Sequence, residues 1–175
     1  MPGGNGRKGR SNSRRAGDRA TKARRVARLA DLDGCVVAGG EPDPRGWHVL
    51  TRESARPGEV ADLLVDLQAM TVCYLEVELD KDALRLREAR RVLVPTNAAS
   101  LNDDEEIVRL GVTTAELLAV PAYDPRSLSR TDQEALRRRY ARYLAHSEAE
   151  LATGMRRRMG DSVQVRKRVG VQDHE

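Results

Sequence analysis

The chain has 175 residues, a formal net charge of +4, 39% hydrophobic residues and no phenylalanine. That length suffices for one core with long appendages, and the core must be built from Leu, Val and Ala. The sequence has no run of eighteen apolar residues and no apolar stretch near its start, so we expect neither a membrane-spanning helix nor a secretory signal.

Charge is divided sharply along the chain. Residues 1–28 hold ten basic residues and one acidic residue, a net charge of +9, whereas residues 29–125 carry a net charge of −10 and residues 126–175 a net charge of +5. An acidic body with basic arms is suited to contact an anionic surface through the arms. Lipid headgroups, nucleic acid and an acidic protein face all remain open as that surface.

We expect a basic N-terminal arm over residues 1–30, disordered or extended in its first half. Residues 1–17 carry charge but almost no apolar side chain, and residues 18–32 are predicted to form a short basic helix. A solvated tail and an arm that orders along a partner are both open. In the second case the residues that contact a partner or lipid would be Arg7, Lys8, Arg10, Arg14, Arg15, Arg24 and Arg25.

The centre of the predicted fold is a β-hairpin over residues 57–79. Apolar and polar side chains alternate along residues 72–79, the pattern of a half-buried strand, with Tyr74 and Glu76 on the solvent side. A second strand precedes it, and residues 68–71 are short enough for the connection. This hairpin is a framework for binding, because it contains no nucleophile and no metal-binding cluster.

Two carboxylates on the first strand of the hairpin are the candidates for proton uptake. Asp62 and Asp66 lie four residues apart and are predicted to share the exposed face, where such a pair can move protons. Alternatively, Asp62 and Asp66 are ordinary exposed acidic residues of the strand that take no part in proton uptake. The sequence lacks the Walker A, GxGxxG, HExxH and GxSxG motifs, so we do not expect an enzyme.

The remaining elements complete a mainly β fold, in which five or six short strands form a small barrel followed by an α-helix. Further strands are predicted at residues 47–50, 91–95 and 107–112, and a short helix after the capping box of Thr113 and Glu116. A longer helix should begin at a second capping box, Thr131 and Glu134. The last basic segment alternates weakly and can pair as a strand if an edge is offered.

The predicted domains are therefore an arm over residues 1–30, a barrel over residues 31–125, a C-terminal helix over residues 126–160 and a basic tail over residues 161–175. The run GEVADLLVDLQAMTVCYLEVEL, with DPRGWHV before it and RRVLVP after it, resembles the PRC-barrel family. The resemblance covers residues 43–123. That family includes the cytoplasmic domain of the photosynthetic reaction-centre H subunit, the C-terminal domain of a ribosome maturation factor and small stand-alone bacterial proteins.

The resemblance implies a non-catalytic docking subunit. Like an H subunit, it would cap the quinone side of a reaction centre at the cytoplasmic face of the inner, photosynthetic membrane. It would contact the membrane subunits and anionic lipid, stabilise the complex and aid proton delivery. Bacteriochlorophyll and quinone would be held by the partner complex and not by this chain. Asp66 matches a family carboxylate near that quinone, whereas the family's second acid falls on Ala69, and the H-subunit membrane anchor has no counterpart here.

Two alternatives remain open at this point. The chain resembles stand-alone PRC-barrel adaptors of stress responses or the cell envelope about as closely. The arginine-rich arms also suit an RNA- or ribosome-associated factor, although the body of the protein is acidic and lacks a row of aromatic side chains on which bases could stack.

Overall fold

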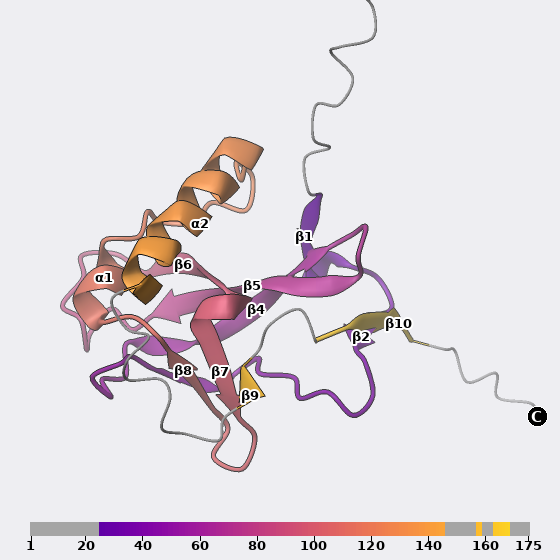
Figure 1. The fold of residues 1–175 in the computed structure, drawn as a ribbon, viewed down its shortest axis with the longest axis horizontal. Coiled ribbons are helices and arrows are strands. Elements are labelled where there is room, and N and C mark those ends of the chain that lie inside the picture. The colour runs from indigo at the N-terminus through magenta and orange to yellow at the C-terminus, as the bar shows by residue number, and fades with distance from the viewer. Residues whose placement is uncertain (1–24, 146–156, 159–162, 169–175) are drawn as a thin grey trace, which may run out of the picture.

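The computed structural model describes residues 25–145, 157–158 and 163–168, which form one large mixed β-sheet, a small two-stranded sheet and one long helix (Figure 1). The large sheet consists of β1 (Val26–Arg28), β3 (His48–Leu50), β4 (Gly58–Asp66), β5 (Thr71–Leu79), β6 (Arg90–Pro95), β7 (Ala99–Asn102), β8 (Ile107–Leu110) and β9 (Arg157–Arg158). The small sheet pairs β2 (Cys35–Val37) with β10 (Val165–Lys167). The helices are α1 (Thr114–Leu118) and α2 (Arg130–Ala145), with short 3₁₀ turns η1 (Leu29–Asp31) and η2 (Thr96–Ala98).

The predicted mainly β class is confirmed, but the large sheet is open where a closed barrel was predicted. Its strand order is β6-β5-β4-β3-β8-β7-β9, with β1 added to the side of β4, and the terminal strands β6 and β9 do not pair with each other. Other groups cap the outer edge of β6. The backbone N–H of Tyr123 donates to the carbonyl of Arg91, and the hydroxyl of Tyr140 donates to the carbonyl of Leu93.

The predicted central hairpin is confirmed as β4 and β5, which pair antiparallel through a turn at residues 67–70. Two register shifts interrupt their ladder, one between Val60 and Asp62 and one between Leu64 and Val65. Irregularities of this kind bend and twist a strand pair. Gly58 is required where the strands meet, because a Cβ atom there would lie 1.9 Å from the carbonyl oxygen of Glu78.

The prediction of a half-buried β5 is wrong, because both faces of the strand are covered. Tyr74 is 1% exposed and Glu76 is 0% exposed, although the alternation placed both on the solvent side. The helix α2 lies over this face (Figure 1), and the side chain of Arg137 donates to the hydroxyl of Tyr74. The sequence pattern of a strand cannot show such cover, since the partner of Tyr74 lies 63 positions away and those of Glu76 lie 48 and 15 positions away.

The ends of the chain differ from the predicted domain boundaries. Val26–Arg28 is a strand that pairs with β4, so the sheet begins inside the segment predicted as arm and helix. At the other end, α2 is described to Ala145, and residues 157–158 form a strand within the range predicted as helix. The predicted pairing of the basic tail is confirmed, since β10 lies against β2.

Helix starts are set by side-chain caps. The predicted box of Thr113 and Glu116 is confirmed at the start of α1. The predicted box of α2 is displaced by two residues: Ser129 and Asp132 bond to each other's backbone N–H groups, and the helix begins at Arg130. Both caps satisfy N–H groups that the first helical turn leaves without partners.

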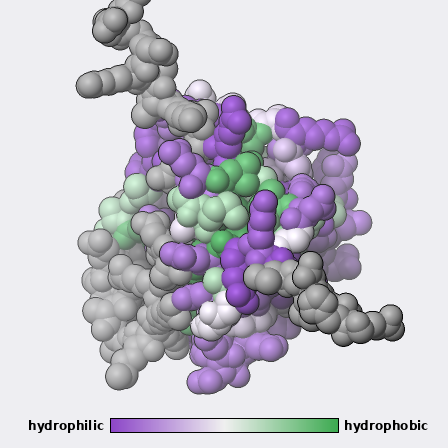
Figure 2. Space-filling view, turned by 90° about the vertical axis from the view of Figure 1, so that its right-hand side faces the viewer, coloured by the Kyte–Doolittle hydropathy of each residue, from purple (hydrophilic) through white to green (hydrophobic). Residues whose placement is uncertain are grey.

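The β2–β10 pair lies beside the tip of the β4–β5 hairpin, at the end of the molecule opposite α1 (Figure 1). On that face, apolar side chains gather in the centre and hydrophilic ones surround them (Figure 2). None of the described helices is long and apolar enough to cross a membrane.

Candidate functional site

A cluster of opposite charges lies on the face of the hairpin that carries Tyr74 and Glu76, and the N-terminal strand β1, which pairs with β4, contributes Arg28 to it. The register places Asp62 beside Glu76 and Glu76 beside Leu93, and it places Glu78 beside Arg91. Directly paired residues in a sheet point to the same face, so these side chains form neighbouring rows on one surface.

Glu76 is the centre of this charge cluster. Its Oε2 accepts from Nε of Arg28 at 2.8 Å, and its Oε1 accepts from a terminal nitrogen of Arg91 at 2.6 Å. The second terminal nitrogen of Arg91 donates to Glu78 at 3.2 Å. Nε of Arg28 also lies 3.3 Å from Oδ2 of Asp62, so one guanidinium joins two buried carboxylates.

The carboxylates of the cluster are buried and the guanidiniums reach outward. The side chains of Glu76 and Asp62 are 0% and 1% exposed, whereas those of Arg28 and Arg91 are 24% and 39% exposed. A buried carboxylate is tolerated when it is paired and hydrogen-bonded. Asp62 meets that condition through the backbone N–H groups of Leu63 and Ala30 as well as Arg28.

The electrostatic environment agrees with this geometry. The hydrogen bond to Glu76 raises the pKa of Arg91, so its charge is secure at any physiological pH. Burial, and secondarily the negative charge of Glu76, raises the pKa of Tyr123 to about 12. The cluster therefore fastens β1 and β6 to the central hairpin.

The predicted proton-uptake pair of Asp62 and Asp66 is not brought together as an exposed pair. Both are buried, at 1% and 7% exposure. Asp62 belongs to the charge cluster, whereas Oδ1 of Asp66 accepts from the backbone N–H groups of Gln68 and Ala69 in the hairpin turn. Four residues along a strand also separate them by roughly 13 Å. The correction has a local cause, since the turn needs an acceptor where β4 ends.

We expect Asp66→Asn to lower the free energy of unfolding by about 1 kcal/mol, because an amide oxygen still accepts in the turn but without charge. Urea denaturation followed by circular dichroism measures this change. The exposed neighbour Gln68, changed to Ala, is the control and should stay within about 0.5 kcal/mol of the parent. Equal effects at both positions would contradict the structural role of Asp66.

The predicted contact residues of the arm fall mostly outside the described ranges. Arg7, Lys8, Arg10, Arg14, Arg15 and Arg24 precede residue 25. Arg25 is described and exposed, and its backbone carbonyl accepts from the N–H of Leu67 next to the hairpin turn. The arm therefore joins the folded body beside β4.

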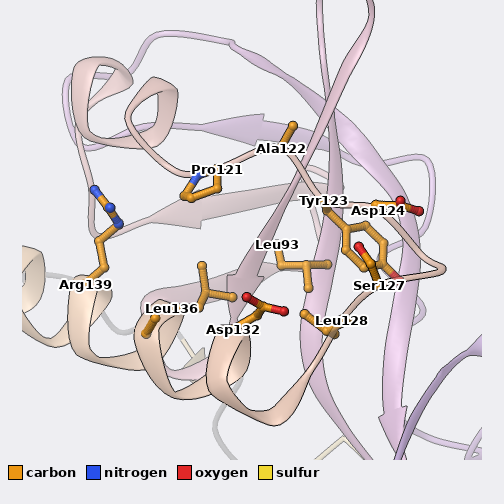
Figure 3. A pocket seen from close by; sticks show the side chains of 11 residues that line it. Leu93, Pro121, Ala122, Tyr123, Asp124, Ser127, Leu128, Asp132, Leu136 and Arg139 are labelled. Carbon is orange, nitrogen blue, oxygen red and sulfur yellow. The ribbon is translucent and has the colours of Figure 1, made fainter.

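A groove opens next to the charge cluster, between α2 and the strap formed by residues 121–128. It encloses about 220 Å³, and Figure 3 shows Leu93 of β6 at its base with Leu128 and Leu136 on either side. Its remaining lining residues are Pro121, Ala122, Tyr123, Asp124, Ser127, Asp132, Ala135 and Arg139. Its apolar base and charged rim are suited to accept an apolar side chain of a partner.

A second cavity lies on the other side of the strap. It encloses about 280 Å³ and shares Tyr123 and Leu128 with the first, while Arg28 of the charge cluster forms part of its wall. The strap therefore separates the apolar groove from the ionic network. Within the described residues, no group of three or more His, Cys, Asp or Glu side chains is placed to hold a metal ion.

Sequence reasoning missed Arg28, Glu76 and Arg91 as members of one site. A signal was present, since Glu76 and Glu78 alternate with apolar residues in one strand and Arg91 stands near the start of the next strand. The partner Arg28 had no such signal, because β1 is only three residues long.

A scan against models of known protein families gives no match to this chain, and a search of curated proteins gives no match either.

Proposed function

We propose that the protein is a non-catalytic docking module of the PRC-barrel type, and that it acts at the cytoplasmic face of a photosynthetic reaction centre. There it would cap the quinone side and stabilise the complex through contacts to the membrane subunits. The fold-family part of this proposal rests on the resemblance of residues 43–123 and on the mainly β fold around the central hairpin.

The observation that carries the proposal is that the buried carboxylates of β4 and β5 accept hydrogen bonds that connect neighbouring strands and close the hairpin turn. Glu76 bridges Arg28 and Arg91, and Asp66 accepts from two amides of its own turn. Groups held in this way fix the positions of strands. The result is a firm platform beside an apolar groove, which is the form a docking surface needs.

The basic arm supplies the second contact of the proposal. Each Lys or Arg near an anionic leaflet contributes about 1 kcal/mol, and the attraction fades within a Debye length. Because Arg25 lies beside the β4–β5 turn, the arm leaves the body at the hairpin end, and not from the groove. A partner complex embedded in lipid offers a protein surface to the apolar groove and an anionic lipid surface to the basic arm.

Neutralising two arm residues should weaken binding to photosynthetic membranes. We expect Arg14→Gln with Arg15→Gln to reduce co-sedimentation with such membranes up to about 30-fold at low salt, and to flatten its salt dependence. The charge-matched control is Arg85→Gln with Arg87→Gln, two exposed arginines of the loop before β6. Deletion of residues 1–28 is unsuitable, because it removes β1 and Arg28.

The control variant should bind like the parent protein. If the parent stays wholly in the soluble fraction at low ionic strength, the reaction-centre proposal fails and a stand-alone adaptor takes its place. If both double variants lose binding equally, general charge and not the arm is responsible.

One observation favours an RNA-associated role as a second candidate. Arg138 and Arg142 are both exposed and lie four residues apart on α2, so they share one side of the helix. Binding of single-stranded RNA with a steep salt dependence, lost in Arg138→Gln, would support it, whereas RNA affinity unchanged by that substitution would count against it.

A further inference from the structure

The turn of the β4–β5 hairpin carries an exposed apolar side chain. Leu67 is 38% exposed, and it is the one large hydrophobic residue that stands exposed among the residues the structure describes. Its backbone N–H donates to the carbonyl of Arg25 at 2.9 Å, so the base of the basic arm lies directly beside it. In the same turn Ala69 is exposed and Met70 is half-buried. The apolar surface of the turn is therefore larger than one side chain.

The strand β10 brings positive charge to the same end of the molecule (Figure 1). The backbone N–H of Val165 donates to the carbonyl of Met70 at 2.9 Å, which fixes β10 against the hairpin turn. Residues 166–168 are Arg, Lys and Arg, and all three side chains are exposed. We call the surface formed by Arg25, residues 67–70 and residues 166–168 the basic tip.

Ion pairing does not neutralise the basic tip. Within the part of the chain that the structure describes, no salt bridge is formed by any of its four cations, Arg25, Arg166, Lys167 and Arg168. The segment around β2 adds two acids, the exposed Asp33 and the half-buried Glu41. Residues 1–24, which precede Arg25, add eight basic residues and one acidic residue. Positive charge is thus in excess at this end.

The apolar surface lies inside a hydrophilic border. Figure 2 views this end of the molecule and shows apolar side chains in the centre with hydrophilic ones around them. An apolar patch with a basic border is typical of proteins that bind a membrane surface, where apolar side chains enter the headgroup region and cations contact anionic lipid. Single-stranded nucleic acid would need aromatic side chains for stacking, and the basic tip has none.

We propose that the basic tip docks on an anionic lipid surface, with Leu67 among the headgroups and residues 166–168 against the phosphates. This inference rests on the membrane location of the proposed function, but contact with lipid requires no reaction centre. The basic tip shares no residue with the groove beside α2, so that groove stays free for a protein partner.

Vesicles of stated composition test the charge and the apolar contact separately. The full chain should bind vesicles of equal parts phosphatidylcholine and phosphatidylglycerol at low salt, and should not bind vesicles of phosphatidylcholine alone. Lys167→Gln with Arg168→Gln should weaken this binding up to about 30-fold, and less at high salt. Leu67→Gln should weaken it about tenfold, whereas Leu67→Met should bind like the parent.

The charge-matched control lies at the far end of β5. That strand is nine residues long, so the loop after it is about 30 Å from the hairpin turn. Arg85→Gln with Arg87→Gln, two exposed arginines of this loop, removes the same charge and should change vesicle binding by less than about twofold. Circular dichroism of each variant checks that the fold is kept.

Tryptophan fluorescence shows which end touches the lipid. Leu67→Trp should give an emission that shifts to shorter wavelength when the phosphatidylglycerol vesicles are added, because an indole in the headgroup region leaves water. Arg87→Trp should give no shift. Trp47 contributes the same background to both variants and to the parent protein. Equal shifts at positions 67 and 87 would show binding without a fixed orientation and would overturn the proposal.

The remaining outcomes separate this inference from the proposed function. Binding to photosynthetic membranes but not to the lipid vesicles would overturn the inference and leave the reaction-centre proposal standing. Binding to the vesicles, with no greater binding to membranes that contain reaction centres, would do the reverse. Vesicle binding that neither Leu67→Gln nor the Lys167 and Arg168 variant weakens would assign the lipid contact to residues 1–24 alone. If single-stranded RNA bound instead, and only the charge variant weakened it, nucleic acid would replace lipid as the partner.

Discussion

Replacing Glu76 with alanine should lower the free energy of unfolding by about 3 kcal/mol. Removing one member of a buried ion pair typically costs about 3–5 kcal/mol, because the remaining charge loses its partner without regaining water. We expect the lower end of that range, since Arg28 and Arg91 are partly exposed and retain Asp62 and Glu78 as neighbours. Urea denaturation followed by circular dichroism measures the change.

Two further variants isolate the role of the charge. Glu76→Gln keeps the shape and one acceptor, so it should cost about 1–2 kcal/mol. Glu78→Gln removes a carboxylate that is 41% exposed and should cost under about 1 kcal/mol. If Glu76→Ala and Glu78→Gln lowered the free energy of unfolding by the same small amount, the cluster would not hold the strands together. A double-mutant cycle of Glu76→Ala and Arg28→Ala should show that their losses of unfolding free energy are not additive.

The central hairpin was predictable because its determinants are local. Alternating side chains, a four-residue connection and a glycine at the start of β4 specify two adjacent strands without reference to the rest of the chain. The box of Thr113 and Glu116 was predictable for the same reason, since both partners lie in one turn. The helix α2 was also predicted, but two overlapping capping patterns stand at its start, and the sequence does not rank them.

The second face of the hairpin was not predictable from its own pattern. The alternation of apolar and polar residues along β5 predicted that Glu76 lies on the solvent-exposed face. The structure buries Glu76 because Arg28, 48 residues earlier, and Arg91, 15 residues later, supply opposite charge. A polar residue on a strand is thus compatible with either environment, and only the long-range partners decide.

The N-terminal strand shows the same limit in another form. Residues 18–32 have the composition of a basic helix, and three residues of strand leave too short a pattern to compete with it. Pairing with β4 supplies hydrogen bonds that the isolated segment lacks, and Arg28 adds its contact to Glu76. Tertiary contacts therefore override a local preference that is weak in itself.

The candidate site was predicted only in part. Asp62 was selected and does belong to the charge cluster, but as an acid held by Arg28 and two backbone amides, and not as half of an exposed pair. The groove was not predicted at all. The groove forms because the strap and α2 pack next to each other over β6. A contact between segments that are distant in the sequence produces no periodic pattern from which it could be predicted.

Removing the ring of Tyr140 should detach α2 from the sheet. The side chain is 1% exposed, its hydroxyl donates to the carbonyl of Leu93 at 3.0 Å, and its ring meets that of Tyr143 edge-on with centroids 5.9 Å apart. Truncating a buried aromatic residue to alanine costs about 3–5 kcal/mol. We expect about 4 kcal/mol for Tyr140→Ala, with hydrogen exchange rising most in residues 130–145 and least in the hairpin.

Tyr140→Phe separates the ring from the hydroxyl and adds a dependence on pH. It keeps the packing and should cost about 1 kcal/mol, the net value of one hydrogen bond. Burial raises the pKa of Tyr140 above its ordinary value, so the unfolded chain loses its phenolic proton first as pH rises. The stability that Tyr140 contributes is therefore complete below about pH 10 and is lost progressively above it.

The parent protein should lose stability above that pH more steeply than Tyr140→Phe. Equal slopes for the parent and Tyr140→Phe would mean that Tyr140 ionises without leaving its site. Because α2 forms one wall of the groove, loss of partner binding in Tyr140→Ala but not in Tyr140→Phe would tie docking to the attached helix and not to the phenol.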